Sequence, residues 1–263
     1  MKNMKNEKPI LLGEMNALQV KRTVNSNTIA LLILGACENH GNHMPFGSDF
    51  IFPLELAKRV SLKSTKHLFI LPPIPYGVSI HHKKFFMTIN IDANTLIKFI
   101  EGILESLIGN GIRKILIING HDGNIAPIEI ASRNTKDKFP HITIACLESW
   151  WTLVGQLSPN TFEVWNGMGH GGEAETSTMM YIRPDLVNIS KAPKDTVPQL
   201  PEHIRIYWNI DELTTTGATG SSKKGSPKKG KIIFKILEDL ILSFIENMEK
   251  NDWKYGLHLK PTN

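Results

Sequence analysis

Four short apolar runs divide the chain and give the first indication of its fold. Each run is five or six residues long, is dominated by aliphatic side chains and lies near Gly, Pro or Asn. They span residues 29–34, 67–71, 114–118 and 142–147. Runs of this length without polar alternation are typical of strands buried on both faces of a parallel sheet.

Other segments repeat apolar residues every three or four positions, which is typical of helices that bury one face. In one of them Leu96, Ile100 and Leu104 fall on a single stripe. The predicted helices span residues 50–60, 92–109, 124–138 and 232–247, and a further helix is expected near 177–181. Strands that alternate with helices indicate a layered α/β domain with a mostly parallel sheet.

The length of 263 residues suits one large α/β domain, and no internal repeat divides it. We expect a single domain over residues 1–263, with a flexible N-terminus at 1–9 and a C-terminal tail at 248–263. The Pro- and aromatic-rich segment 72–86 and the Gly/Ser-rich segment 217–230 lack periodicity. Both are predicted to be loops, and loops on a rigid α/β frame often contain functional residues.

The formal charge is +5, and one concentration of positive charge is the segment from Lys223 to Lys231. No basic run is interleaved with aromatic residues for base stacking, so we expect a solvated loop and no nucleic-acid site. A second interpretation stays open, in which this lysine segment binds the phosphate of a nucleotide-like substrate.

The sequence gives no indication of export or membrane insertion. Cys37 and Cys146 match neither a disulfide framework nor a CxxC metal site, and we expect buried thiols in a reducing cytosol. No stretch approaches the ~20 apolar residues of a membrane helix, and the N-terminal apolar run is too short for a signal peptide. We therefore expect a cytoplasmic protein.

The first cluster of chemically capable residues follows the run 29–34 directly. Glu38 and His40 are two positions apart and share a face in an extended chain. Asp49 follows after a loop that contains Gly and Pro. Ligands of open α/β sheets bind beyond the carboxyl ends of strands, and carboxylates with imidazoles suit Zn²⁺, Mn²⁺ or Fe²⁺. The alternative is a polar surface loop.

A second cluster, NGHDGN at residues 119–124, follows the run 114–118 and places His121 at another strand end. The alternative is a plain turn in which Asp122 or Asn124 caps the next helix.

The third cluster, GMGHGGEAET at residues 167–176, contains His170, Glu173 and Glu175. At ~3.6 residues per turn the two glutamates of a helix would diverge by about 200°, so at most one would face a given metal. The other would stabilise the helix N-terminus. His170 is a candidate general acid or base because histidine titrates near neutral pH.

Three such clusters, each after a predicted strand, indicate a two-metal hydrolase. A carboxylate can bridge two ions, and water bound between them becomes a nucleophile at neutral pH.

The motifs also resemble those of a known family. GACENHGNHMPFGSD resembles the GsxEqHGpHLPlgtD signature of the creatininase family, and NGHDGN resembles its NGHGGN motif. GHGGEAETS with the following RPDLV, and PPIPYGVSIHH, resemble two further family segments. The similarity extends from about residue 10 to about residue 245.

The resemblance implies a binuclear centre of Zn, Mn or Fe. In it Glu38 and His121 would bind one ion and His40 the other, with Asp49 bridging both. The implied fold is a three-layer α/β/α sandwich, and the implied assembly is a homo-oligomer, commonly a homohexamer.

The last ligand is where the chain departs from the creatininases proper. Those enzymes use a Glu two positions after the motif's His, where this chain has Gly123. Many family members with NGHGGN instead carry a Glu three positions after the later His, which is Glu173 here. The resemblance therefore implies that Glu173 binds the second ion and takes part in catalysis. His170 matches the family's proton-transfer histidine, although Gly169 replaces the Glu that precedes it in creatininases.

Substrate contacts are expected from the aromatic-rich segment 72–86, from the NGHDGN motif and from nearby tryptophans. Creatininases hold an aromatic clamp over the substrate, and Trp151 is a further candidate for this clamp. The predicted contacts are Tyr76, His82, Asp122, Trp150 and Trp165. His81 or His82 would act within one subunit or across a subunit interface.

The predicted function is metal-dependent hydrolysis of a C–N bond in a cyclic or small amide, similar to creatinine amidohydrolase. One alternative is a deformylase of a formamidopyrimidine nucleotide in flavin or deazaflavin biosynthesis. The other is a family member that binds a small ligand without catalysis.

Overall fold

A five-stranded, entirely parallel sheet forms the centre of the molecule. The computed structural model describes residues 8–193 and 206–255. In spatial order the strands are β1 (Ile10–Leu11), β3 (Leu68–Ile70), β2 (Ile29–Leu34), β4 (Lys114–Asn119) and β5 (Thr143–Leu147). The four predicted strands are confirmed. β1 is a two-residue edge strand, too short for a periodic signal.

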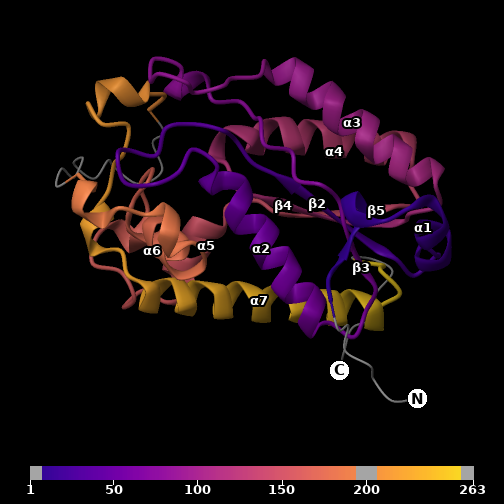
Figure 1. Cartoon of the computed structure of the whole chain (residues 1–263). Helices are drawn as coiled ribbons and strands as arrows, with labels where there is room; N and C mark the ends of the chain where they lie inside the picture. The colour runs from indigo at the N-terminus through magenta and orange to yellow at the C-terminus, as the bar shows by residue number, and fades with distance from the viewer. Residues whose placement is uncertain (1–7, 194–205, 256–263) are drawn as a thin grey trace.

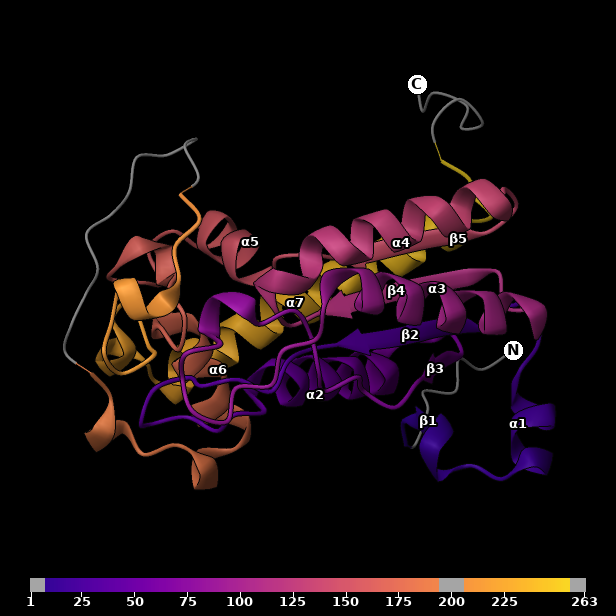
Figure 2. The same cartoon turned by 90° about the horizontal axis from the view of Figure 1, so that it is seen from above.

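Helices cover both faces of the sheet (Figures 1 and 2). They are α1 (Ala17–Thr23), α2 (Ser48–Lys63), α3 (Ala93–Gly109), α4 (Ile125–Lys138), α5 (Trp150–Leu157), α6 (Glu173–Ile182) and α7 (Pro227–Lys250). α3 and α4 lie on one face, and α2 and α7 lie on the other (Figure 1). This arrangement confirms the layered α/β domain that the sequence pattern predicts and the α/β/α sandwich that the family resemblance implies.

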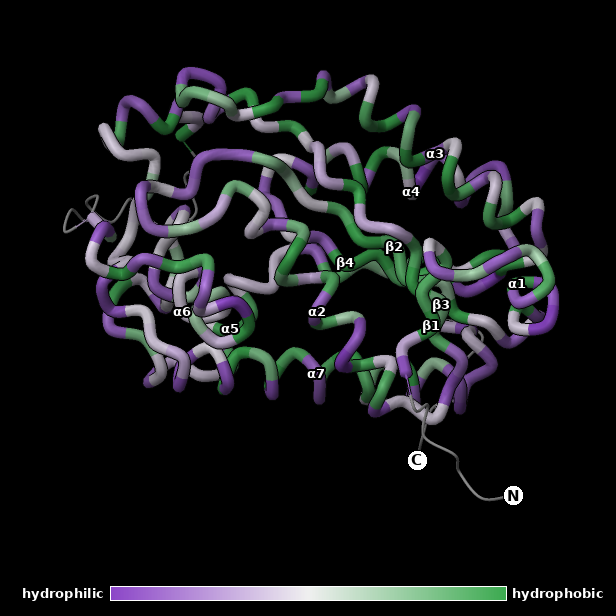
Figure 3. The backbone as a smooth tube through the Cα atoms, in the orientation of Figure 1, coloured by the Kyte–Doolittle hydropathy of each residue, from purple (hydrophilic) through white to green (hydrophobic). Residues whose placement is uncertain are grey.

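The alternation of side chains along β2 divides the interior into two cores. Ile29, Leu31 and Ile33 pack with α2, α5 and α7, whereas Ala30, Leu32 and Leu34 pack with α3 and α4. All six residues are buried, and the central strands are the green middle of Figure 3. Burial on both faces explains why this strand is a continuous apolar run.

Four segments differ from the sequence-based expectations. The predicted loop 217–230 becomes helical at Pro227, because Ser226 caps the helix and Pro suits its first turn. α7 then continues to Lys250, and Trp253 is buried beyond it, inside the predicted tail. α1 and α5 are helices that the sequence did not predict. Residues 1–7 and 256–263 lie outside the described part of the chain.

Within residues 8–193 and 206–255, no helix has both the length and the apolarity needed to span a bilayer.

The carboxyl ends of β2 and β4 meet through backbone contacts that only glycine allows. The Gly120 amide donates to the Leu34 carbonyl at 2.8 Å. A Cβ added at Gly120 would lie 1.8 Å from the Asp49 carbonyl oxygen, and one added at Gly35 would lie 2.6 Å from the same atom. The start of α2 therefore lies directly against both strand ends, which brings Asp49 beside the loops that follow them.

Gly120→Ala should therefore damage both the fold and the site, because the new methyl group overlaps backbone. We expect a loss of at least about 1–3 kcal/mol of stability, together with weakened metal binding. Gly102→Ala, on the exposed side of α3 with no atom within 4 Å of the new Cβ, is the matched control and should stabilise by ~0.5–1 kcal/mol. Thermal unfolding and metal content check both variants. Equal thermal stability and equal metal content in the two variants would contradict this explanation.

Candidate metal centre

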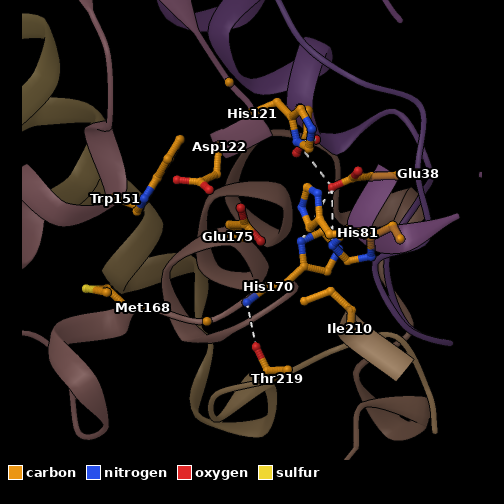
Figure 4. Close-up of a pocket in the computed structure, with 14 residues that line it drawn as sticks. Glu38, His81, His121, Asp122, Trp151, Met168, His170, Glu175, Ile210 and Thr219 are labelled. Carbon is orange, nitrogen blue, oxygen red and sulfur yellow. Dashed lines mark hydrogen bonds and ion pairs between the residues drawn. The ribbon is translucent and has the colours of Figure 1, made fainter. Parts of the chain in front are cut away.

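Four predicted ligands from three separate segments are buried together. Glu38 and His40 follow β2, Asp49 lies in the first turn of α2, and His121 follows β4. Their exposed fractions are 0%, 0%, 5% and 3%. They adjoin a cavity of about 220 Å³, which Glu38, Asp49 and His121 line (Figure 4).

The Asp49 carboxylate lies between two imidazoles. Its Oδ1 is 2.9 Å from His40 Nε2, and its Oδ2 is 3.1 Å from His121 Nδ1. Glu38 Oε1 is 3.2 Å from the same His121 nitrogen. The arrangement has two halves that share Asp49, one with Glu38 and His121 and the other with His40.

Glu175 completes the second half. One ligand atom each from His40, Asp49 and Glu175 lie within 4.8 Å of one another. Glu175 Oε2 also accepts the Gly171 amide at 2.6 Å, which orients the carboxylate.

Backbone carbonyls orient both imidazoles for metal binding. His40 Nδ1 is 3.0 Å from the Glu38 carbonyl oxygen, and His121 Nε2 is 2.9 Å from the Val78 carbonyl oxygen. Each of these nitrogens must donate its proton there, which turns the other ring nitrogen toward the carboxylates. Metal-ligating histidines are typically held in this way by a second hydrogen bond.

Buried carboxylate oxygens that face only imidazoles indicate that the residues fit a divalent cation. Both carboxylate oxygens of Glu38 and Oδ2 of Asp49 are buried and have no hydrogen bond of good geometry, although His121 Nδ1 lies 3.1–3.2 Å from Glu38 Oε1 and Asp49 Oδ2. Native proteins rarely leave such atoms unsatisfied except where an ion or another functional group compensates them. Carboxylate oxygens with imidazole nitrogens are the donor set of Zn²⁺, Mn²⁺ and Fe²⁺.

Protons take the place of metal charge in the metal-free centre. Burial alone would lower the pKa of His40, but the Asp49 carboxylate outweighs it and raises the pKa to about 10. The pKa of His121 is likewise raised well above its ordinary value despite burial, because Glu38 and Asp49 face it. Burial raises the pKa of Glu175 to about 7.

His170 lies at the edge of the same carboxylate cluster and remains neutral. Its Nε2 donates to the Asn39 carbonyl at 2.6 Å, and its Nδ1 is 3.5 Å from Glu38 Oε1. Burial lowers the pKa of this imidazole to about 4. Its Nδ1 is therefore a free proton acceptor directed at the centre.

The expectation for Glu173 is wrong. Its carboxylate is fully buried but accepts the backbone amides of Glu163 and Val164 at 3.1–3.2 Å and pairs with Lys229. The two glutamates do point in different directions, as the helical spacing predicts. The one that faces the metal half-site is Glu175, and Glu173 holds the segment before α6 against α7.

The predicted substrate contacts divide into two groups. His82 and Asp122 line the cavity. Trp150 is instead a core residue, 2% exposed, with its ring 4.2 Å from that of Phe52. Tyr76 and Trp165 are not among the residues that line the cavity. The neighbour of Trp150, Trp151, provides the aromatic wall.

Four further residues line the cavity without having been predicted as part of the site. They are Met168, Gly169, Ile210 and Thr219. Thr219 exchanges two hydrogen bonds with the His170 backbone, at 2.7 and 2.9 Å. Met168 and Gly169 belong to the GMGHGGEAET cluster beside His170, whereas no local motif marks Ile210 or Thr219, which reach the site only through the fold.

With this geometry established, comparison with known proteins identifies the family. A family model described as creatininase, creatinine amidohydrolase, matches residues 13–245. The chain belongs to the creatininase family. Members of this family are hydrolases that act on C–N bonds.

Two characterised relatives and one solved structure illustrate the breadth of the creatininase family. The chain is 26% identical to creatinine amidohydrolase of Pseudomonas putida, over 87% of this chain and 93% of the relative. It is 23% identical to a mycofactocin precursor peptide peptidase of Mycobacterium ulcerans, over 89% and 91%. A creatininase structure described with Mn has the same fold, with a TM-score of 0.80, 24% identity and coverage of 91% and 98%.

Glu175→Gln and Glu173→Gln form a matched pair on one helix that tests the corrected ligand. Glu175→Gln should lower bound metal from about two equivalents to about one, because the second half loses a charged ligand. Glu173→Gln should keep both equivalents but lose about 1–3 kcal/mol of stability, because the carboxylate that pairs with Lys229 is gone. Elemental mass spectrometry and thermal unfolding measure the two effects. Loss of metal in Glu173→Gln but not in Glu175→Gln would instead support Glu173 as the ligand of the second ion.

Stability of the chelated protein should fall as pH rises. His40 has a raised folded-state pKa of about 10, so the stability that its proton contributes is complete below the ordinary histidine pKa of about 6.5 and is lost as pH approaches about 10. Glu175 also has a raised pKa, of about 7, so the stability that its proton contributes is likewise lost as pH rises toward 7. Metal binding instead strengthens as these protons leave.

The thermal midpoint of EDTA-treated protein should therefore decrease between about pH 7.5 and pH 9.5, while that of Mn²⁺-loaded protein changes less. His40→Gln should flatten the slope of the chelated form. A chelated midpoint that does not depend on pH would contradict the proposed proton at His40.

Proposed function

We propose that this protein is a metal-dependent amidohydrolase that cleaves a C–N bond in a small or cyclic amide. The proposal assigns two divalent ions to Glu38, His40, Asp49, His121 and Glu175, with Asp49 between them. The observation on which it rests is the set of buried carboxylate oxygens that face imidazole nitrogens at 3.1–3.2 Å and have no hydrogen bond of good geometry. A binuclear centre would polarise an amide carbonyl and lower the pKa of water to about 7.

His170 is the proton carrier of the proposed reaction. Its neutral Nδ1 would accept a proton from the attacking water and deliver it to the leaving nitrogen. The hydrogen bond from Nε2 to the Asn39 carbonyl keeps the ring in the tautomer that this role requires. The His82 ring lies 3.9 Å from the His170 ring, and burial lowers the pKa of His82, so this neighbour adds no positive charge.

The cavity favours a small substrate. Its volume of about 220 Å³ lies below the ~300–1,000 Å³ of typical ligand pockets. A small amide would fit within it, whereas an extended peptide or a nucleotide would have to reach beyond it. A centre with a full set of ligands and a positioned proton acceptor also favours an enzyme over a non-catalytic binding protein.

The lysine segment gives little support to a phosphorylated substrate. Lys224 pairs with Glu163 at 2.7 Å, and Lys229 pairs with Glu173. Neither lines the cavity, and the part of the cavity wall that is described contains no Lys or Arg. The formamidopyrimidine nucleotide is therefore the weaker of the two catalytic candidates. The homo-oligomer stays a prediction.

His170→Ala should retain two equivalents of metal and lose about 10²–10⁴-fold in kcat, because proton transfer is lost while the ligands stay intact. The assay follows hydrolysis of a panel of cyclic amides and formamides by Mn²⁺-loaded enzyme, and EDTA should abolish turnover. His141→Ala, at an exposed position beyond α4, is the matched control and should retain wild-type kcat. Normal turnover by His170→Ala would remove His170 from the mechanism.

A further inference from the structure

One imidazole beside the metal centre has no role in the ligand set described above. His81 lies in the short 3-10 turn Ile80–His82, lines the cavity and is half-buried. One ligand atom each from Glu38, His81 and His121 lie within 4.8 Å of one another. Glu38 and His121 belong to the first half of the centre, and the ligands that the family resemblance implies do not include His81. The first half therefore has a further nitrogen donor within reach.

The His81 ring stands parallel to the ring of the ligand His121. Their centroids are 5.7 Å apart, and their planes differ by 10°. His121 Nδ1 is 3.2 Å from Glu38 Oε1. Figure 4 shows His81, Glu38 and His121 on one side of the cavity, across from Trp151. Because zinc–ligand distances are ~2.0–2.2 Å, ligand atoms at this separation need at most a small side-chain rotation to share an ion.

The segment before His81 is fastened to the ligand loop. The Val78 carbonyl accepts the hydrogen bond from His121 Nε2 at 2.9 Å. The Val78 amide donates to the Asn124 side chain at 3.1 Å. The buried His82 ring packs edge-to-face on the His81 ring, with centroids 4.6 Å apart. These contacts hold the two imidazoles, His81 and His121, in a fixed relation before any ion binds.

The adjacent His82 has a different environment. Its Nε2 is 3.8 Å from Glu38 Oε1, and its ring packs on His170 with centroids 3.9 Å apart. Within residues 8–193 and 206–255, His82 belongs to no group of three side chains with metal-ligand spacing. Of the two neighbouring histidines, His81 is therefore the one placed to bind the first ion.

A second imidazole would change the chemistry of the first half. Without His81, each half has one imidazole and two carboxylates, because both halves share Asp49. With His81, the first half has two nitrogen and two oxygen donors, whereas the second half keeps only one imidazole. Imidazole nitrogens favour Zn²⁺, and carboxylate oxygens favour Mn²⁺. Four such ligands also form the tetrahedral set that zinc prefers.

We propose that His81 is a fourth protein ligand of the first ion, and that it makes this half of the centre selective for Zn²⁺ over Mn²⁺. The inference rests on the proposed function, because it takes the binuclear centre from there. It assigns His81 to the metal and not to the substrate. The two halves of the centre therefore differ in the metal that they prefer.

The test compares Zn²⁺ and Mn²⁺ affinity in EDTA-treated protein by competition with a chromophoric chelator. Glu175→Gln is the background, since it leaves only the first half with its full ligand set. In this background His81→Phe keeps an aromatic ring but removes both nitrogens. Zn²⁺ affinity should fall at least about 10- to 100-fold, the loss that removal of a partner around a metal site causes. Mn²⁺ affinity should fall less, because manganese depends more on the carboxylates.

His141→Phe is the matched control. It makes the same substitution at an exposed position beyond α4 and should leave both affinities unchanged. His81→Ala is a second variant that introduces no larger ring and should lower the Zn²⁺ to Mn²⁺ affinity ratio in the same way. Circular dichroism confirms that each variant is folded.

X-ray absorption at the zinc edge counts the imidazoles directly. Wild-type protein with one equivalent of Zn²⁺ should show two imidazole nitrogens at ~2.0–2.1 Å. His81→Phe with one equivalent should show one, because each half then offers a single imidazole. One imidazole in wild-type protein would overturn the role of His81.

The outcomes separate this inference from the proposed function. An equal loss of Zn²⁺ and Mn²⁺ affinity in His81→Phe, or no loss at all, would overturn the role of His81 and leave the binuclear centre standing. Zinc selectivity that depends on His81, in a protein that hydrolyses no amide, would support the ligand and overturn the catalytic proposal. Wild-type protein that binds neither metal would overturn both.

Discussion

The buried carboxylates of Glu38 and Asp49 impose the strongest physical constraint on this structure. An uncompensated charge inside a protein costs several kcal/mol, so these groups require positive charge beside them. In the metal-free form the imidazoles of His40 and His121 hold protons at elevated pKa to supply it. A divalent ion would replace those protons and bind the carboxylate oxygens, which have no hydrogen bond of good geometry. The close approach of β2, β4 and α2, which only glycine permits at Gly120, brings the charges together.

Much of this arrangement could be predicted because it follows from local rules. Continuous apolar runs predicted the central strands, and polar clusters at their carboxyl ends predicted four candidate ligands that the fold brings together. The choice between Glu173 and Glu175 could not be made in this way. Their helical spacing shows only that they diverge. The decision comes from the fold, in which the amides of residues 163 and 164 and the Lys229 ammonium surround Glu173.

The other misassignments have related causes. Trp150 and Trp151 are adjacent, and only tertiary packing determines that Trp150 enters the core while Trp151 lines the cavity. The lysine-rich segment 217–230 looked like a loop by composition. Ser226 followed by Pro227 is nevertheless a recognisable helix start, which the Gly/Ser/Lys composition of the segment does not reveal. A two-residue strand such as β1 leaves no periodic signal.

The most direct test of the binuclear centre is an anomalous difference map from crystals grown with Mn²⁺, with data collected on both sides of the manganese absorption edge. The account predicts two peaks on either side of the Asp49 carboxylate, roughly 3.5–4 Å apart, as in two-metal sites. One peak should lie beside Glu38 and His121, and the other beside His40 and Glu175. A single peak, or a peak beside Glu173 and Lys229, would contradict it.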